Sequence, residues 1–201
     1  MNALDDLKAD THRQAGQYAF LLLLKRFVVS RTFRVTVTLR LCQWAASGPG
    51  LRRRFLLIFQ VLHRIAAHNA CMDLPWRTKI GGGVLLVHGW GLVVNEGAVI
   101  GSNVTLLHGV TLGQSDRILS DGNRLTQFPI IEDEVWVGPH AIIIGGVTIG
   151  KGSRIAGGAF VYESVPPHSL VSGNPASIIR CSVLADVLNP APSSSIRANR
   201  R

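Results

Sequence analysis

The stretch from Ile131 to Val161, IEDEVWVGPHAIIIGGVTIGKGSRIAGGAFV, carries an aliphatic residue at every sixth position. Earlier parts of the chain keep the same period. The residues in this register are Ile80, Leu86, Ile100, Leu106, Leu112, Ile131, Val137, Ile143, Ile149, Ile155 and Val161. A helix repeats near 3.6 residues and a half-buried strand near 2, so a period of six requires a larger unit that turns a corner at each repeat.

We therefore predict an all-β fold, a left-handed parallel β-helix of hexapeptide repeats with a triangular cross-section. Each hexapeptide forms one face of this prism, and three form one coil. Coils stacked about 4.8 Å apart align the register residues into apolar ladders along the axis. The left-handed winding is an exception to the usual crossover rule, which we accept because no other repeat architecture has this period.

Composition divides the chain into three parts. Residues 1–70 are predicted to be a small α-helical N-terminal region, and residues 71–180 the β-helix domain. Within that domain the register is lost at 114–128, a polar and turn-rich stretch that we expect to protrude as a loop. Residues 181–201 read as a C-terminal tail that is partly disordered.

The N-terminal region holds eleven Lys and Arg against three Asp, and it contains the apolar runs FLLLLKRFVV and FLLIFQVLHRIAAH. We predict helices over 3–26, 30–46 and 51–69. In one interpretation they pack on each other and on the prism, with their bases solvated. In the other they make peripheral contact with an anionic membrane. The bases assigned to that contact are Arg31, Arg34, Arg40, Arg52, Arg53 and Arg54.

Several classes of function and location are disfavoured. Each apolar run is shorter than the roughly 20 residues that span a bilayer. No recognition motif accompanies the basic residues, so nucleic acid is not an expected partner. Asp5 and Asp6 stand where a signal peptide would be basic, and the three cysteines have neither metal-ligand nor disulfide spacing. We expect a cytoplasmic protein.

Two histidines occupy equivalent positions in the repeat. His88 lies two residues after Leu86 and His108 two after Leu106, so we expect one imidazole above the other on the outside of the prism. Asp73, fifteen residues before His88, is expected to meet that imidazole from the preceding layer. A carboxylate on one ring nitrogen raises the basicity of the other, as a general base for a hydroxyl requires. The competing interpretation is that these histidines are structural.

The segment MDLPWRTKIGGGVLLVHGWGLVVNEGAVIGSNVTLLHGVTLG, which ends at Gly113, resembles the serine acetyltransferase branch of the hexapeptide-repeat acyltransferases. The closing motif VPPHSLVSGNPASII resembles the same family. Within the branch, the chain looks most like the exopolysaccharide O-acetyltransferases, such as the colanic acid enzyme. The resemblance implies a homotrimer with active sites between subunits and acetyl-CoA as donor. By position, His88 matches the catalytic base that drives direct attack on the thioester, and Asp73 matches its partner.

Departures from the family bear on the acceptor. Val87 stands where serine acetyltransferases have Asp, and Gln127 and Phe128 replace an Arg-His pair. These changes remove charges that complement a zwitterion. We therefore predict acetylation of a sugar hydroxyl in exopolysaccharide or lipid-linked saccharide biosynthesis. The alternatives are serine O-acetyltransferase of cysteine biosynthesis and a catalytically silent trimeric scaffold.

The remaining site residues fall into two groups. His108, Trp90 and Phe128 are predicted to bind the saccharide acceptor, the two aromatics by stacking on a sugar ring. The residues matched or assigned to acetyl-CoA are Ala156, Gly157, Lys151, Arg154 and Arg180. No metal is expected, because the zinc-binding prisms need a second His five residues after His108, where this chain has Gly113.

Overall fold

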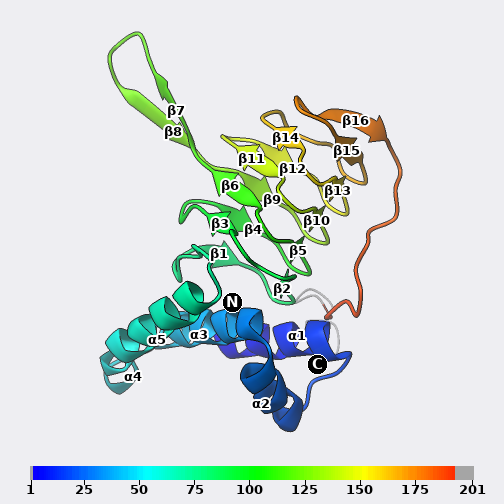
Figure 1. The fold of residues 1–201 in the computed structure, drawn as a ribbon. Helices are drawn as coiled ribbons and strands as arrows, with labels where there is room; N and C mark the ends of the chain where they lie inside the picture. The colour runs from blue at the N-terminus through cyan, green and yellow to red at the C-terminus, as the bar shows by residue number, and fades with distance from the viewer. Residues whose placement is uncertain (1, 193–201) are drawn as a thin grey trace, which may run out of the picture.

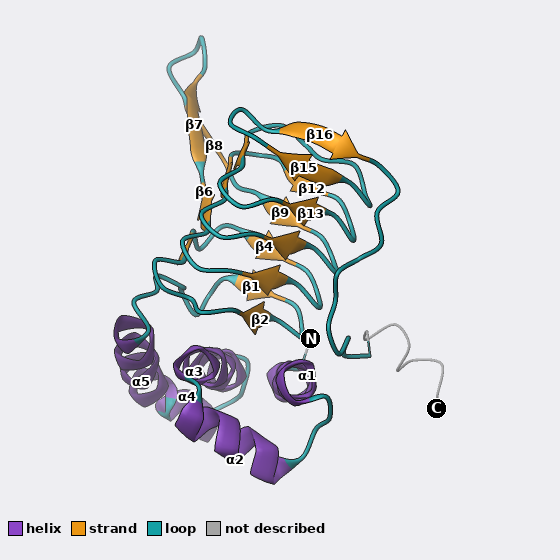
Figure 2. Ribbon diagram, turned by 45° about the vertical axis from the view of Figure 1, so that its right-hand side comes forward, coloured by secondary structure: helices purple, strands orange, loops and turns teal. Residues whose placement is uncertain are grey.

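The computed structural model describes residues 2–192, in which a base of helices lies beneath a triangular β-prism (Figure 1). The helices are α1 (Ala3–Ala15), α2 (Phe20–Val29), α3 (Arg31–Ala46), α4 (Leu51–Arg54) and α5 (Leu56–Asn69). Figure 2 shows α1 and α3 directly beneath the prism, with α2 on the side away from it.

Three parallel sheets form the faces of the prism. The first contains β1 (Lys79–Ile80), β4 (Val99–Ile100), β9 (Ile130–Ile131) and β12 (Thr148–Ile149). The second contains β2 (Leu85–Leu86), β5 (Thr105–Leu106), β10 (Trp136–Val137), β13 (Arg154–Ile155) and β15 (Leu170–Ser172), with β16 (Ser177–Arg180) antiparallel at its edge. The third contains β3 (Val93–Val94), β6 (Thr111–Gly113), β11 (Ile142–Ile144) and β14 (Phe160–Val161).

The register residues form the core, which confirms the predicted left-handed β-helix. Each one is at most 3% exposed. Neighbouring coils pair them directly, as Ile100 with Ile131 and Ile131 with Ile149. Aliphatic side chains therefore stack along the axis while the backbone pairs from coil to coil.

The predicted helix over 3–26 is wrong, because the chain breaks it at Gly16. This glycine has φ 78°, and its N–H donates to the carbonyl of His12 as a left-handed cap. A second helix, α2, begins only at Phe20. The chain thereby reverses, and the apolar run of α2 comes to lie outside α1 and α3 (Figure 2).

A buried ion pair joins the helices to the open end of the prism. Arg40 of α3 donates to the carbonyls of Ile80 and Gly81 at 2.8 and 2.7 Å, and its Nε lies 2.8 Å from Asp10 of α1. Asp10 in turn accepts from the N–H of Gly83 at 2.8 Å. Elsewhere in the prism, the next coil forms the hydrogen bonds that such backbone groups need. At this open end no further coil follows, and Arg40 and Asp10 form those hydrogen bonds instead. The expectation that Arg40 faces a membrane is wrong, since its side chain is fully buried.

The stretch predicted as a loop is a β-hairpin. Strands β7 (Ser115–Ile118) and β8 (Arg124–Gln127) pair antiparallel and extend away from the prism (Figure 1). The described part of the tail, residues 181–192, returns along the prism toward the helices (Figure 1), and the predicted partial disorder of the tail stays a prediction. Ala191 exchanges two hydrogen bonds of 2.9 Å with the Asn103 side chain. Residues 193–201 lie outside the described part of the chain.

Candidate active site

Three histidines from successive layers form a column on the outside of the prism. The ring centroids of His88 and His108 lie 5.9 Å apart, which confirms the predicted superposition. The ring of His140 follows at 5.0 Å from His108, with the two planes perpendicular. Counting along the repeat does not predict His140. Leu106 pairs with Val137, so the position two residues on, which holds His108 in one coil, holds Pro139 in the next, and His140 comes one residue later.

His88 lies at a tight corner between β2 and β3. Its φ is 62°, and Gly89 and Gly91 also have positive φ, of 73° and 67°. Glycine suits Gly89 because L-residues rarely adopt its positive φ, and a Cβ there would also displace the end of the Met72 side chain. The bulge predicted from the interrupted register thus has a specific backbone shape, which leaves the His88 side chain exposed.

Arg31, from the N-terminal end of α3, holds this corner from outside. Its Nη2 donates to the carbonyl of His88 at 2.9 Å, and its guanidinium lies 3.5 Å from the centroid of the Trp90 ring. One face of the indole is therefore occupied by a cation rather than open to a sugar ring. The contact joins residues 57 positions apart, and no local pattern in the sequence signals it.

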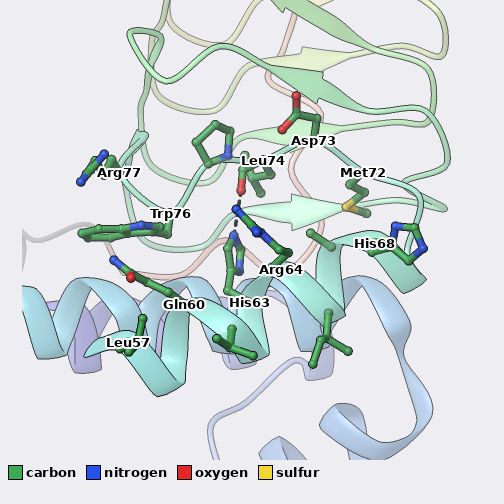
Figure 3. Close-up of a pocket in the computed structure, with 14 residues that line it drawn as sticks. Leu57, Gln60, His63, Arg64, His68, Met72, Asp73, Leu74, Trp76 and Arg77 are labelled. Carbon is green, nitrogen blue, oxygen red and sulfur yellow. Dashed lines mark hydrogen bonds between the residues drawn. The ribbon is translucent and has the colours of Figure 1, made fainter. Parts of the chain in front are cut away.

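Asp73 pairs through its backbone with Val93 and has an exposed side chain. No hydrogen bond joins its carboxylate to the imidazole of His88 within residues 2–192, so the expected pair does not form in the single chain. Asp73 instead lines a cleft of about 790 Å³ between α5 and the entry to the first coil. In Figure 3 its carboxylate points away from the helix.

The same cleft contains a buried histidine, His63 of α5. Its Nε2 donates to the carbonyl of Leu74 at 2.8 Å, as the dashed line in Figure 3 shows. Its Nδ1 lies 3.0 Å from Oγ1 of Thr38 on α3. Burial lowers the pKa of His63 from its ordinary value, and the hydrogen bond to the backbone of Leu74 opposes the shift only partly. His63 therefore links the helices to the prism rather than serving as an exposed base.

Gln127, the last residue of β8, and Phe128, which follows it, pack on glycines of the prism. A Cβ on Gly97 would meet the Phe128 ring at 2.5 Å, and one on Gly146 would meet the Gln127 amide at 2.7 Å. Both side chains thus lie against the prism wall. The packing at these glycines accounts for a glutamine and a phenylalanine at positions 127 and 128. The two residues are therefore weaker evidence about the charge of an acceptor.

The residues predicted to bind acetyl-CoA differ in whether their polar groups already have partners among the described residues. The N–H of Ala156 already donates to the carbonyl of Val171, whereas the N–H of Gly157, which is exposed, has no partner among the described residues. Arg154 pairs with Asp186 at 2.7 Å and Lys151 with Glu134 at 3.6 Å. Arg180 on β16 makes no ion pair within residues 2–192. The part of the chain that the structure describes contains no group of three or more side chains suited to hold a metal ion.

Comparisons with known proteins point in one direction. The family model described as Bacterial transferase hexapeptide (six repeats) matches residues 128–163. "Serine acetyltransferase 2" of Arabidopsis thaliana is 42% identical over 109 residues, which are 54% of this chain and 32% of that protein. "Serine acetyltransferase" of Escherichia coli (strain K12) is 39% identical over 127 residues, which are 63% of this chain and 44% of that protein. The chain thus spans less than half the length of these curated relatives.

Solved structures agree with the sequence relatives. The crystal structure of serine acetyltransferase from Brucella abortus strain S19 is 30% identical, with a TM-score of 0.69 over 88% of this chain and 68% of that chain. The same enzyme in complex with coenzyme A is 30% identical, with a TM-score of 0.68 over 91% of this chain and 68% of that chain.

These findings overturn the predicted acceptor. The prediction of a sugar O-acetyltransferase in exopolysaccharide biosynthesis is wrong, because these relatives are named serine acetyltransferases. The predicted closeness to exopolysaccharide enzymes has no support among them. The error arose from treating Gln127 and Phe128 as acceptor contacts, although both pack on the prism.

Proposed function

We propose that this chain, which belongs to the hexapeptide-repeat acyltransferase family, transfers an acetyl group from acetyl-CoA to the hydroxyl of L-serine. The observation that carries the proposal is the similarity to the Brucella abortus serine acetyltransferase over most of this chain. The exposed imidazole of His88, backed by His108, provides the chemistry at a defined corner. A silent scaffold would not need that arrangement.

His88 acts as the general base in this proposal. Its neutral imidazole accepts the proton of the serine hydroxyl while the oxygen attacks the thioester carbonyl of acetyl-CoA. The tetrahedral intermediate then collapses, the carbon–sulfur bond breaks, and the leaving thiolate takes the proton back from the imidazolium. Asp73 is the carboxylate that we propose to pair with His88 in the assembled enzyme, since its side chain is exposed and its carboxylate accepts no hydrogen bond within residues 2–192.

Acetyl-CoA is the proposed donor, in keeping with the coenzyme A complex of the Brucella abortus relative. In this proposal the exposed N–H of Gly157, which has no partner within residues 2–192, donates to an amide carbonyl of the pantetheine arm. Arg180, which makes no ion pair within the same residues, binds a phosphate. Lys151 and Arg154 must first leave Glu134 and Asp186 to contribute.

The proposed assembly is a homotrimer of parallel prisms, with the site between neighbours, and the proposed location is the cytoplasm. Peripheral contact with the inner face of the membrane is a separate proposal, which rests on the helical base rather than on the prism. Among residues 2–192, no helix is long and apolar enough to cross a bilayer.

The test is a thiol-release assay with the purified chain, acetyl-CoA and L-serine, with O-acetylserine identified by mass spectrometry. His88→Ala should lower the rate by about 10² to 10⁴, the usual contribution of a general base. His168→Ala is the matched control, since His168 is also exposed and has a positive φ of 56°. Equal rates for His88→Ala and the parent chain, or turnover of oligosaccharides with serine inert, would refute the proposal.

A further inference from the structure

Two helices of the base present apolar side chains to solvent. No residue of α2 is buried, and Leu21 and Val28 are 78% and 73% exposed. In α5 only His63 is buried. We call the exposed apolar side chains of α2, α4 and α5, with Phe55 between the last two, the basal apolar face. Its members are Phe20, Leu21, Leu24, Val28, Val29, Leu51, Phe55, Leu57, Ile58, Val61, Leu62 and Ile65.

A groove of about 200 Å³ connects α2 and α3 with α5. Phe27 and Leu41 line one side, and Leu62 and Ile65 the other. Arg34 also lines it, and its Nε is buried without a hydrogen-bond partner in the described chain. This groove therefore brings apolar side chains of α2, α3 and α5 together, with the Arg34 guanidinium among them.

The charged side chains of the helical base after α1 begins its last turn are all basic. From Thr11 to Met72 the sequence contains no Asp or Glu and ten Lys or Arg. Arg13 and Arg40 are buried at the junction with the prism. The other eight lie on α2 to α5, the helices that carry or adjoin the basal apolar face, and none makes an ion pair within residues 2–192. They are Lys25, Arg26, Arg31, Arg34, Arg52, Arg53, Arg54 and Arg64.

From this combination we propose that the basal apolar face binds the surface of an anionic bilayer. Apolar side chains of α2 and α5 enter the boundary between headgroups and acyl chains, while the surrounding bases meet lipid phosphates. The occupant is not a second copy of this chain, because pairing two such faces would oppose eight bases to eight with no acid between them. The inference goes beyond the proposed acetyl transfer and does not depend on it.

Vesicle co-sedimentation of the full chain tests the proposal. We expect binding to vesicles in which a third of the lipid is phosphatidylglycerol, little binding to pure phosphatidylcholine, and release from the anionic vesicles as salt is added. The double variant Arg53→Glu with Arg54→Glu should weaken binding by about tenfold or more. Leu21→Ser with Val28→Ser should weaken it at low salt as well, because the apolar part is unscreened.

The hairpin offers a matched control. Arg117→Glu with Ile118→Ser exchanges an exposed base and an exposed apolar residue far from the base of the molecule, and it should leave vesicle binding unchanged. Circular dichroism of each variant reports whether it is folded, independently of acetyl transfer. Equal binding to neutral and anionic vesicles, or no binding to either, would overturn the proposal. So would a larger oligomer at low salt that Leu21→Ser with Val28→Ser abolishes, since that result assigns the face to self-association.

Discussion

At the scale of single residues, the corner that carries His88 is shaped by backbone conformation. His88 and His140 both have positive φ, of 62° and 57°, which L-residues rarely adopt outside special turns. The coil supplies the constraint that keeps them there, because each corner is bonded to the corners above and below. The N–H of His140, for example, donates to the carbonyl of His108 at 2.9 Å. The three rings are therefore held by the repeat itself.

Arg31 is the side chain that reinforces this corner from the helical base. We expect Arg31→Met to lower kcat/KM for acetyl transfer by about tenfold, because it removes the hydrogen bond to the His88 carbonyl and the contact with Trp90. Steady-state kinetics with acetyl-CoA and L-serine measure the effect. Arg53→Met, on an exposed position of α4, is the control and should keep the parent rate. An undiminished rate in Arg31→Met would show that the corner needs no such support.

At the scale of elements, α1, α3 and α5 hold the prism through buried polar contacts. Asp10 and Arg40 satisfy backbone groups at its open edge, and His63 bonds Leu74 at the entry to the first coil. Removing one partner of a buried ion pair typically costs about 3–5 kcal/mol, which explains why these helices cannot be replaced by any amphipathic segment. Their apolar packing alone would leave the edge of the sheet unpaired.

His63 makes the stability of this junction depend on pH. Because its pKa is lowered in the folded state, the unfolded chain binds the proton more readily, and stability is lost as pH falls below the ordinary value of about 6.5. The full contribution is present above that value. Urea unfolding between about pH 7.5 and about pH 5 should show a decline in the free energy of unfolding.

The glutamine variant His63→Gln, which cannot titrate, should show a shallower decline over the same range. His68→Gln, on an exposed position one turn later in α5, should keep the slope of the parent chain. Identical slopes for His63→Gln and the parent would rule out His63 as the source of the pH dependence.

At the scale of the whole molecule, the prism exposes on its faces the outward residues of each short strand. Ile130, Ile142 and Val93 are apolar and between 40% and 44% exposed, whereas their inward neighbours are buried. Burying such residues between copies of the chain would give each prism the partner that the proposed site between subunits requires. A solitary prism would leave them in water.

We expect light scattering to give a molar mass of about three times 21.7 kDa in dilute solution. Ile142→Glu, at the centre of an outer face, should shift the species toward the monomer and abolish acetyl transfer together with it. Ile118→Glu, on the hairpin tip and 60% exposed, is the control for adding a charge at an apolar position. A fully active monomer would contradict a site built from two subunits.

Much of the prism could be read from residue spacing. Contacts between uninterrupted coils join positions eighteen residues apart, as in Ile131 and Ile149. The separation grows to twenty for Leu86 and Leu106 across the bulge, and to 31 for Ile100 and Ile131 across the hairpin. A repeat therefore encodes its own long-range contacts, and the stacking of His88 on His108 followed from counting. The hairpin showed only as lost register, and its strands were not foreseen because polar alternation over four residues is a weak signal.

The periodic spacing of aliphatic residues was enough to establish the β-helix, its core and the stacked pair His88 and His108. Only the tertiary structure shows that Arg31 reaches the His88 corner, that Arg40 and Asp10 close the prism, and that α2 turns its apolar side outward. The physical reason is that contacts between uninterrupted coils recur at one sequence separation, which a period records. Each contact between the helices and the prism occurs only once, so no repeated spacing in the sequence predicts it.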